Sequence, residues 1–212
     1  MVFAAGATWH RYWNDHVSSM LSLSATGNSF DRLMYTPARN DTGFSNESTE
    51  MEQTLDGSVQ IDLDNGYQIS GGAYARRCDF DIRLYQKPDT LKLYSDSLDS
   101  IGTPVDPPTH TKEPHSDSHD SYKYGGFISA IVPLGSRFTV VPGLRYDGFT
   151  FTNQRSLSPR LSARFELRPE LDITGAFCFQ YQDPDYAALS IHRHNYSLPS
   201  KRGITGIAGI EK

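Results

Sequence analysis

Histidines and carboxylates gather in one polar segment of the chain. Three histidines occur there at spacings of five and four residues, His110, His115 and His119, with Asp117 and Asp120 among them. Imidazole and carboxylate groups are suitable ligands for zinc, copper or nickel. The spacings are not those of a ligand pair on a helix or a hairpin, so a solvated polar segment is the alternative interpretation. His192 and His194 lie in a second polar segment and would extend the same metal site.

A second set of residues, candidates for lining a ligand path, lies on the polar side of segments that alternate between apolar and polar residues: Arg145, Arg160, Arg164 and Glu166. If these segments form the wall of a barrel, the four side chains face its lumen, where they line a ligand path or a hydrated wall. Charged side chains on a lipid-facing surface cost roughly 2–4 kcal/mol for Arg or Lys at mid-bilayer, so the alternation also identifies the lipid face.

No catalytic site is predicted. Ser156 and Ser158 have no His or Asp arrangement that would activate a nucleophile, and Pro184 between Asp183 and Asp185 indicates a turn. The two cysteines, Cys78 and Cys178, fit no metal-ligand spacing. We therefore expect neither an enzyme nor a cofactor.

The elements that position these residues are long strands. Leu157–Leu167 alternates strictly between apolar and polar residues, and Leu171–Tyr181 and Phe138–Tyr146 do the same. Side chains on a strand point alternately to opposite faces, so each segment has one apolar and one polar face. Such segments match the roughly 9–11 residues that a tilted strand needs to cross a bilayer.

The same pattern continues along the chain and predicts an all-β fold, an antiparallel up-and-down meander of about nine long strands forming part of a transmembrane β-barrel. We treat residues 1–212 as a single partial barrel domain. The expected strands cover residues 3–13, 17–35, 50–63, 67–85, 121–132, 137–151, 157–167, 171–181 and 201–211.

The connections differ in length in a regular way. Short turns are expected at 14–16, 64–66, 133–136 and 168–170, whereas long external loops are expected at 36–48, 86–120 and 182–200, with an intermediate one near 152–156. Asn65-Gly66 favours a hairpin turn at positive φ. The alternation changes phase near Arg76–Asp79, which a bulge or the exit of the strand from the membrane would explain. A bulge or a local irregularity is also expected at Pro142.

Composition narrows the classes of function. The formal net charge is −5 and the pI is near 5.8, which argues against nucleic acid as a partner. Hydrophobic content is 37%, with no continuous apolar run of helical membrane-span length. The first residues, VFAAGATWHRYW, lack the basic and apolar regions of a signal peptide.

Several motifs occur together in a familiar order. GLRYDGFTF, LSPRLSARFEL, LDITGAFCFQYQDPDYAALS and LPSKRGITGIAGIEK follow one another, and GSVQIDLDNGYQISGGAYARR precedes them. This order resembles the barrel of TonB-dependent outer-membrane receptors, strongly over residues 122–212 and loosely over 1–75. The resemblance implies a receptor in the outer membrane of a Gram-negative bacterium, surrounded by lipid, that takes up a scarce ligand such as a siderophore, metal complex, vitamin or saccharide.

The resemblance also implies a 22-stranded barrel closed by a plug and energised by TonB. No plug or TonB box is recognised in this sequence, so these two partners are expected only in a full-length protein. The chain is expected to be an internal part of a larger receptor or a remnant open reading frame. The competing interpretation is a small stand-alone β-barrel, or a soluble β-sandwich that acts as a binding or adhesion module.

Overall fold

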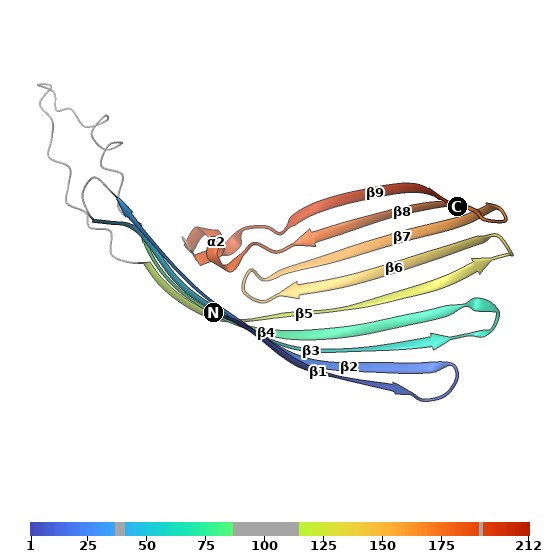
Figure 1. The fold of residues 1–212 in the computed structure, drawn as a ribbon, viewed down its shortest axis with the longest axis horizontal. Coiled ribbons are helices and arrows are strands. Elements are labelled where there is room, and N and C mark those ends of the chain that lie inside the picture. Colours follow the sequence, from blue (N-terminus) through green and yellow to red (C-terminus); the bar gives the residue numbers. More distant parts are fainter. Residues whose placement is uncertain (37–40, 87–114, 191–192) are drawn as a thin grey trace, which may run out of the picture.

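A computed structural model shows one antiparallel sheet in which each strand pairs with the next along the chain (Figure 1). It describes residues 1–36, 41–86, 115–190 and 193–212. The strands are β1 (Val2–Tyr12), β2 (Val17–Thr36), β3 (Asp41–Asp62), β4 (Gln68–Gln86), β5 (His115–Leu134), β6 (Phe138–Phe149), β7 (Gln154–Arg168), β8 (Leu171–Gln182) and β9 (Lys201–Glu211).

The predicted meander of nine long strands is therefore confirmed. The sheet is open, because β1 and β9 form its two edges and do not pair with each other. In the described part of the chain there is no second sheet to cover either face, which a β-sandwich would require. The sandwich interpretation is thus not favoured.

The two faces of the sheet differ in chemistry. We call the face that carries Tyr74, Arg145 and Asp147 the inner face, because these side chains line a hollow of the curved sheet. The opposite, outer face is apolar over most of its width. Leu55 is 50% exposed there and Ile128 57%. Large exposed apolar patches mark surfaces that contact another protein or a membrane.

The predicted phase change in β4 occurs without a bulge. The register of β4 with β3 and β5 runs uninterrupted through Arg76, Arg77 and Cys78. Before Arg76 in the sequence of β4 the outer face is apolar. After it the outer face carries Arg77, which forms ion pairs with Asp79 and Asp120 at 3.1 Å each. The backbone is regular, so the inversion reflects a change in what each face contacts.

The connections at one end of the sheet are all short, and the two longest ones, β4–β5 and β8–β9, lie at the other end (Figure 1). We call these the turn end and the loop end. At the β3–β4 turn, Asn65 has φ 62° and Gly66 φ 81°. Both values are positive, as predicted for Asn-Gly, and they suit the right-handed twist of the flanking strands. The β6–β7 connection at the loop end is short, unlike its neighbours at that end.

The predicted loop boundaries need correction. β3 begins at Asp41 and β5 begins at His115, so the expected loops 36–48 and 86–120 are both too long. Main-chain pairing continues there although the sequence is mostly polar and has no apolar period, and periodicity cannot detect such a strand. The expected loop 182–200 contains two short helical segments, α2 (Tyr186–Ser190) and η2 (Arg193–Ser197).

Pro142 disturbs the ladder as expected. Pairing of β5 with β6 is recorded at Ser129–Gly143 and resumes at Val132–Val140, because Pro142 has no N–H to donate. The register is the same on both sides of the gap, so no bulge forms. On its other side Pro142 pairs with Leu161 in unbroken register.

Strand ends shift steadily across the sheet. The row that starts at Arg11 runs through Ser19, Val59, Gly71, Ile128, Leu144 and Pro159. Strand ends at the turn end move progressively beyond this row, from Tyr12 in β1 to Arg168 in β7. This stagger is what the tilted strands of a barrel show. None of the helical segments in the described part of the chain has the length and hydropathy that a membrane crossing would need.

Candidate functional site: the inner face

The inner face forms a hollow of about 880 Å³ lined by charged and polar side chains. Even-numbered residues of β4, β7 and β8 and odd-numbered residues of β6 point into it, because neighbouring strands pair in register. Charged members of the lining include Asp56, Arg76, Lys123, Arg145, Asp147 and Arg160. The hollow therefore carries both signs of charge.

Three residues form a connected group at its centre. The Tyr74 hydroxyl donates to Asp147 Oδ1 at 2.7 Å, and Arg145 donates to the same carboxylate through Nε at 2.8 Å and Nη2 at 2.7 Å. The Arg145 guanidinium lies 5.3 Å from the centre of the Tyr74 ring. Both carboxylate oxygens thus receive charge-assisted bonds, which hold Arg145 in one position.

Gly125 makes this group possible. It lies on β5 between Tyr74 and Asp147, its partners on the two neighbouring strands. A Cβ atom at position 125 would lie 2.7 Å from both Asp147 Oδ1 and Tyr74 Cε1. Only a residue without a side chain lets the phenol cross the strand.

The four residues predicted to line the lumen lie on this same face, in separate settings. Arg145 is paired with Asp147, and Arg164 forms an ion pair with Asp172 on β8. Arg160 lines the hollow and forms no ion pair within the described residues. Glu166 follows Arg164 on the same face of β7. The register brings them to one face without joining them in one cluster.

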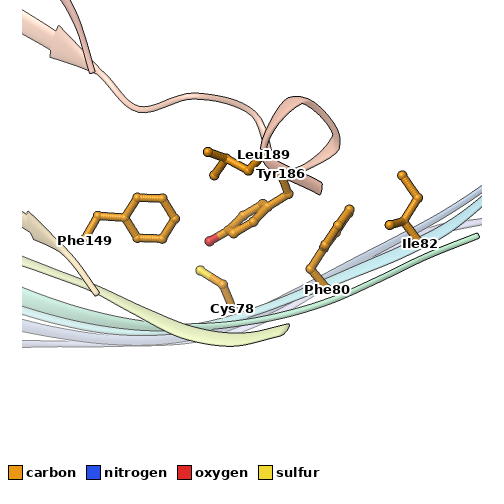
Figure 2. Close-up of a cluster of buried hydrophobic side chains, with 6 residues drawn as sticks. All are labelled: Cys78, Phe80, Ile82, Phe149, Tyr186 and Leu189. Carbon is orange, nitrogen blue, oxygen red and sulfur yellow. The ribbon is translucent and has the colours of Figure 1, made fainter. Parts of the chain in front are cut away.

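Toward the loop end the inner face becomes apolar and is covered. Tyr186 and Leu189 of α2 pack on Cys78, Phe80 and Ile82 of β4 and on Phe149 of β6 (Figure 2). Leu189 is 0% exposed and Tyr186 5%. The Tyr186 ring lies between Phe80, with which it stacks at 5.3 Å, and Phe149, which it meets edge-on at 5.7 Å.

This covered cluster explains the inverted alternation in β4. On the turn-end side of Arg76 the inner face of β4 lines the polar hollow, whereas at Phe80 and Ile82 it contacts the apolar side of α2. Burial raises the pKa of the Tyr186 phenol, which therefore remains neutral at ordinary pH. Lys123 Nζ caps the cluster, at 4.7 Å from the Phe149 ring and 4.9 Å from the Tyr186 ring.

Hydrogen bonds between polar side chains hold the rest of the segment between β8 and β9 in place. Gln154, the first residue of β7, accepts hydrogen bonds from Ser200 N at 2.7 Å and Ser200 Oγ at 2.8 Å and donates to the Leu198 carbonyl. His119 Nε2 lies 2.8 Å from Asp117 Oδ1 and 2.9 Å from the Tyr196 hydroxyl. The segment is thus held to β4, β5, β6 and β7 together.

The structure describes only some of the residues of the predicted histidine site. His110 lies outside the described residues, and so does His192. His115 and His119 belong to β5 rather than to a loop, which corrects the predicted boundary. Asp117 lies beside His119, whereas Asp120 points to the outer face and pairs with Arg77. Over the described ranges, no three His, Cys, Asp or Glu side chains come together as a metal site. Both cysteines are free.

Sequence reasoning missed the covering segment. Residues 182–200 are polar on average, and the anchors Tyr186 and Leu189 appear there as isolated apolar residues. The short run Tyr186-Ala187-Ala188-Leu189 was the available signal. Its matching surface, the inward Phe80 and Ile82, appeared only as a change of phase.

Comparison with solved structures finds the same fold in larger receptors. A ferripyoverdine receptor of the outer membrane of Pseudomonas aeruginosa matches with a TM-score of 0.70 at 13% identity, over 99% of this chain and 30% of the receptor. A ferric enterobactin receptor (PfeA) of the same bacterium matches with a TM-score of 0.67 at 17% identity, over 99% and 32%. The copper transporter OprC matches with a TM-score of 0.53 at 14% identity, over 88% and 30%.

The chain thus spans about a third of the length of the receptors it matches. No curated protein sequence matches it. The protein family described as "TonB dependent receptor-like, beta-barrel" matches residues 3–198. That match covers nearly the whole sheet, and the chain therefore belongs to the family of TonB-dependent receptor-like β-barrels.

Proposed function

We propose that this chain forms part of the wall of an outer-membrane receptor that takes up a scarce ligand in a TonB-dependent manner. The observation that carries the proposal is the division of the sheet into two faces. Leu21, Leu55, Ile128 and Leu161 project from the outer face. The inner face carries the paired charges of Arg145, Asp147 and their neighbours. A sheet of this kind suits lipid on one side and water on the other.

The residues at the loop-end limit of the apolar face support contact between this face and lipid. Its limit toward the loop end lies where Arg77, Asp79 and Asp120 form exposed ion pairs. Tyr122 pairs in register with Arg77, and Tyr124 follows on the same face of β5 toward the turn end. Tyrosines concentrate where the hydrocarbon layer meets the headgroups. Because outer-membrane barrels have short turns on the periplasmic side and longer loops outside, the loop end extends outside the cell and the turn end faces the periplasm.

The inner face would line the ligand path. Arg160 is a cation without an ion-pair partner in the described part of the sheet, and Arg145, Arg164 and Glu166 contribute to the same wall. The relatives include receptors for ferripyoverdine and ferric enterobactin and a copper transporter. We therefore favour a siderophore or another metal complex over a vitamin or a saccharide, with the histidines at 110, 115 and 119 as candidate metal ligands.

TonB and a plug domain would be partners of the complete protein. The plug would fill the space inside the sheet, and TonB would act from the periplasmic side. Family membership supports both partners, and the described residues contain neither.

Cysteine labelling on intact cells tests the orientation. In the complete polypeptide that carries these residues, with Cys78 and Cys178 replaced by serine, a single cysteine is introduced at Asn153 of the β6–β7 connection or at Ser136 of the β5–β6 turn. A membrane-impermeant maleimide should label Asn153→Cys on intact cells and Ser136→Cys only after the outer membrane is permeabilised. Equal labelling of both before permeabilisation would show that the sheet does not span this membrane.

Uptake assays test which ligand the complete protein transports. Cells that depend on the complete protein should accumulate a ferric siderophore under iron limitation only when TonB is present. Loss of uptake on replacing Arg160 by Gln, with unchanged amounts of protein in the outer membrane, would place this residue on the path. Arg168→Gln at a periplasmic turn is the matched control.

A further inference from the structure

Arg11 lies on the outer face of β1, one residue before the strand ends at the turn end. Its row across the sheet continues through Val59, Ile128 and Leu144, which are exposed and apolar. Of the ion pairs formed by the described residues, none involves Arg11. Among the described residues, this fixed positive charge at the edge of an apolar surface therefore has no carboxylate partner.

The two tryptophans of the chain hold this arginine. Trp9 and Trp13 are its neighbours at i−2 and i+2, so all three side chains leave the same face of the chain. The Arg11 guanidinium lies 4.0 Å from the Trp13 ring centre and 5.9 Å from that of Trp9. Trp13 is fixed in turn, because its Nε1 donates to Ser19 Oγ at 2.9 Å and Ser19 is the register partner of Arg11.

No hydrogen bond joins the Arg11 side chain to the described part of the chain, which leaves its donors available to a ligand. A guanidinium that stacks on an indole uses its planar face, and the N–H groups at its edge remain available. Trp9 is 51% exposed and Trp13 54%, so the site opens outward and not into the hollow. Within the proposed function, outward means toward the membrane at the level of the periplasmic headgroups.

At that level a phosphate is the matching anion. Arginine binds phosphate oxygens through two parallel N–H groups, and such charge-assisted bonds are roughly twice as strong as neutral ones. Tryptophan prefers the same depth, since its ring is apolar and its N–H is polar. An arginine costs far less near the interface than at mid-bilayer, so it can be kept there for binding.

We propose that Arg11, held between Trp9 and Trp13, binds the phosphate of a phospholipid headgroup in the periplasmic leaflet. The inference rests on the proposed function, because it requires the outer face to meet lipid. It adds a specific lipid site at the turn end of β1.

Lipid titration of the complete polypeptide tests the site. Native mass spectrometry of the detergent-purified protein counts bound phosphatidylglycerol for the wild type, Arg11→Gln, Arg11→Lys and Arg155→Gln. Arg155 is the matched control, an exposed arginine on the same face of the sheet at its loop end, where β7 begins. Heat-dependent gel mobility verifies that each variant is folded.

We expect Arg11→Gln to weaken the tightest phosphatidylglycerol site roughly tenfold, as for the loss of a hydrogen bond to a charged group. Arg11→Lys should restore part of the affinity, because it keeps the charge and loses the planar stacking. Arg155→Gln should bind as the wild type does. If Arg11→Gln fails to fold, the loss in Arg11→Lys relative to Arg155→Gln decides the matter.

Three results would overturn the inference. Equal binding by the wild type and Arg11→Gln would show that the arginine is not a ligand. An equal loss in Arg155→Gln would reduce the effect to general charge. Displacement of the lipid by an equal concentration of inorganic phosphate would make the site one for the free ion. In all three cases the protein still enters bilayers, so the proposed function stands; a wild type that does not enter bilayers overturns both.

Discussion

Tyr74 on β4 and Asp147 on β6 are joined by a hydrogen bond of 2.7 Å that crosses the strand between them. The bond ties three strands together on the inner face, and Arg145 completes the charge of the carboxylate. In an up-and-down sheet most contacts join neighbouring strands only. A link across a strand therefore adds rigidity to the inner face.

Gly125→Ala should break this link. The added methyl group would lie 2.7 Å from Asp147 Oδ1 and Tyr74 Cε1 and 2.5 Å from the Tyr146 carbonyl oxygen, and the last atom belongs to the backbone and cannot swing away. We expect a loss of about 1–3 kcal/mol in the free energy of unfolding, the usual range for overpacking. Urea unfolding in phospholipid vesicles measures it.

The control for that variant is Gly175→Ala. A Cβ at position 175 would meet its nearest atom, the Ile207 carbonyl oxygen, at 3.9 Å, an ordinary contact distance. Its stability should stay close to that of the wild type. Equal losses at positions 125 and 175 would mean that the crossing of Tyr74 is not what Gly125 permits.

Leu55→Lys should be poorly tolerated if the outer face meets lipid. Leu55 is half exposed on that face, and a lysine near mid-bilayer costs roughly 2–4 kcal/mol. Ser58→Lys, on the inner face of the same strand and lining the hollow, should cost much less. The yield of folded protein in vesicles and its urea midpoint distinguish the two. Similar costs at both positions would argue that both faces contact water.

Leu189→Ala should release the segment that covers the inner face. Leu189 is fully buried against β4, and such truncations cost about 2–5 kcal/mol. Because the contact is local, we expect faster hydrogen exchange at the Leu189 amide, which bonds to the Asp185 carbonyl, with little change in β7 or β8. Leu198→Ala, at an exposed position beside η2, serves as the control. Unchanged exchange in Leu189→Ala would show that α2 is held by other contacts.

Alkaline pH should loosen the same segment. Burial raises the pKa of Tyr186 above its ordinary value of 10.0, so the neutral phenol is the form that packs. The folded state then holds its proton more tightly than the unfolded state does. The stabilisation is complete below pH 10 and is lost as the pH rises through the raised pKa.

Subtilisin cleavage between β8 and β9, followed from pH 8 to pH 11, measures this effect. Cleavage should increase at the alkaline end for the wild type and stay flat for Tyr186→Phe, which keeps the ring and lacks the ionisable hydroxyl. A Tyr186→Phe variant with the same increase would assign the effect to another group.

Much of this fold follows from periodicity alone. The strict alternation at Leu157–Leu167 and Leu171–Tyr181 predicted β7 and β8 within a few residues, because one face must be apolar and the other polar. Asn65-Gly66 predicted its turn for an equally local reason, since both residues accept positive φ. The family and the order of the strands were accessible from the same patterns and motifs.

The tertiary structure decided what lies opposite each face. His115–Ser121 forms part of β5 although its side chains show no apolar period, because pairing with β4 requires only the backbone. Phe80 and Ile82 look like a fault in the alternation until Tyr186 and Leu189, a hundred residues later in sequence, are seen to cover them. The stacking of Trp13 on Arg11 depends on a hydrogen bond to Ser19, across the hairpin. Sequence periodicity records which face of a strand is apolar; only the assembled sheet shows whether that face meets lipid, water or another part of the chain.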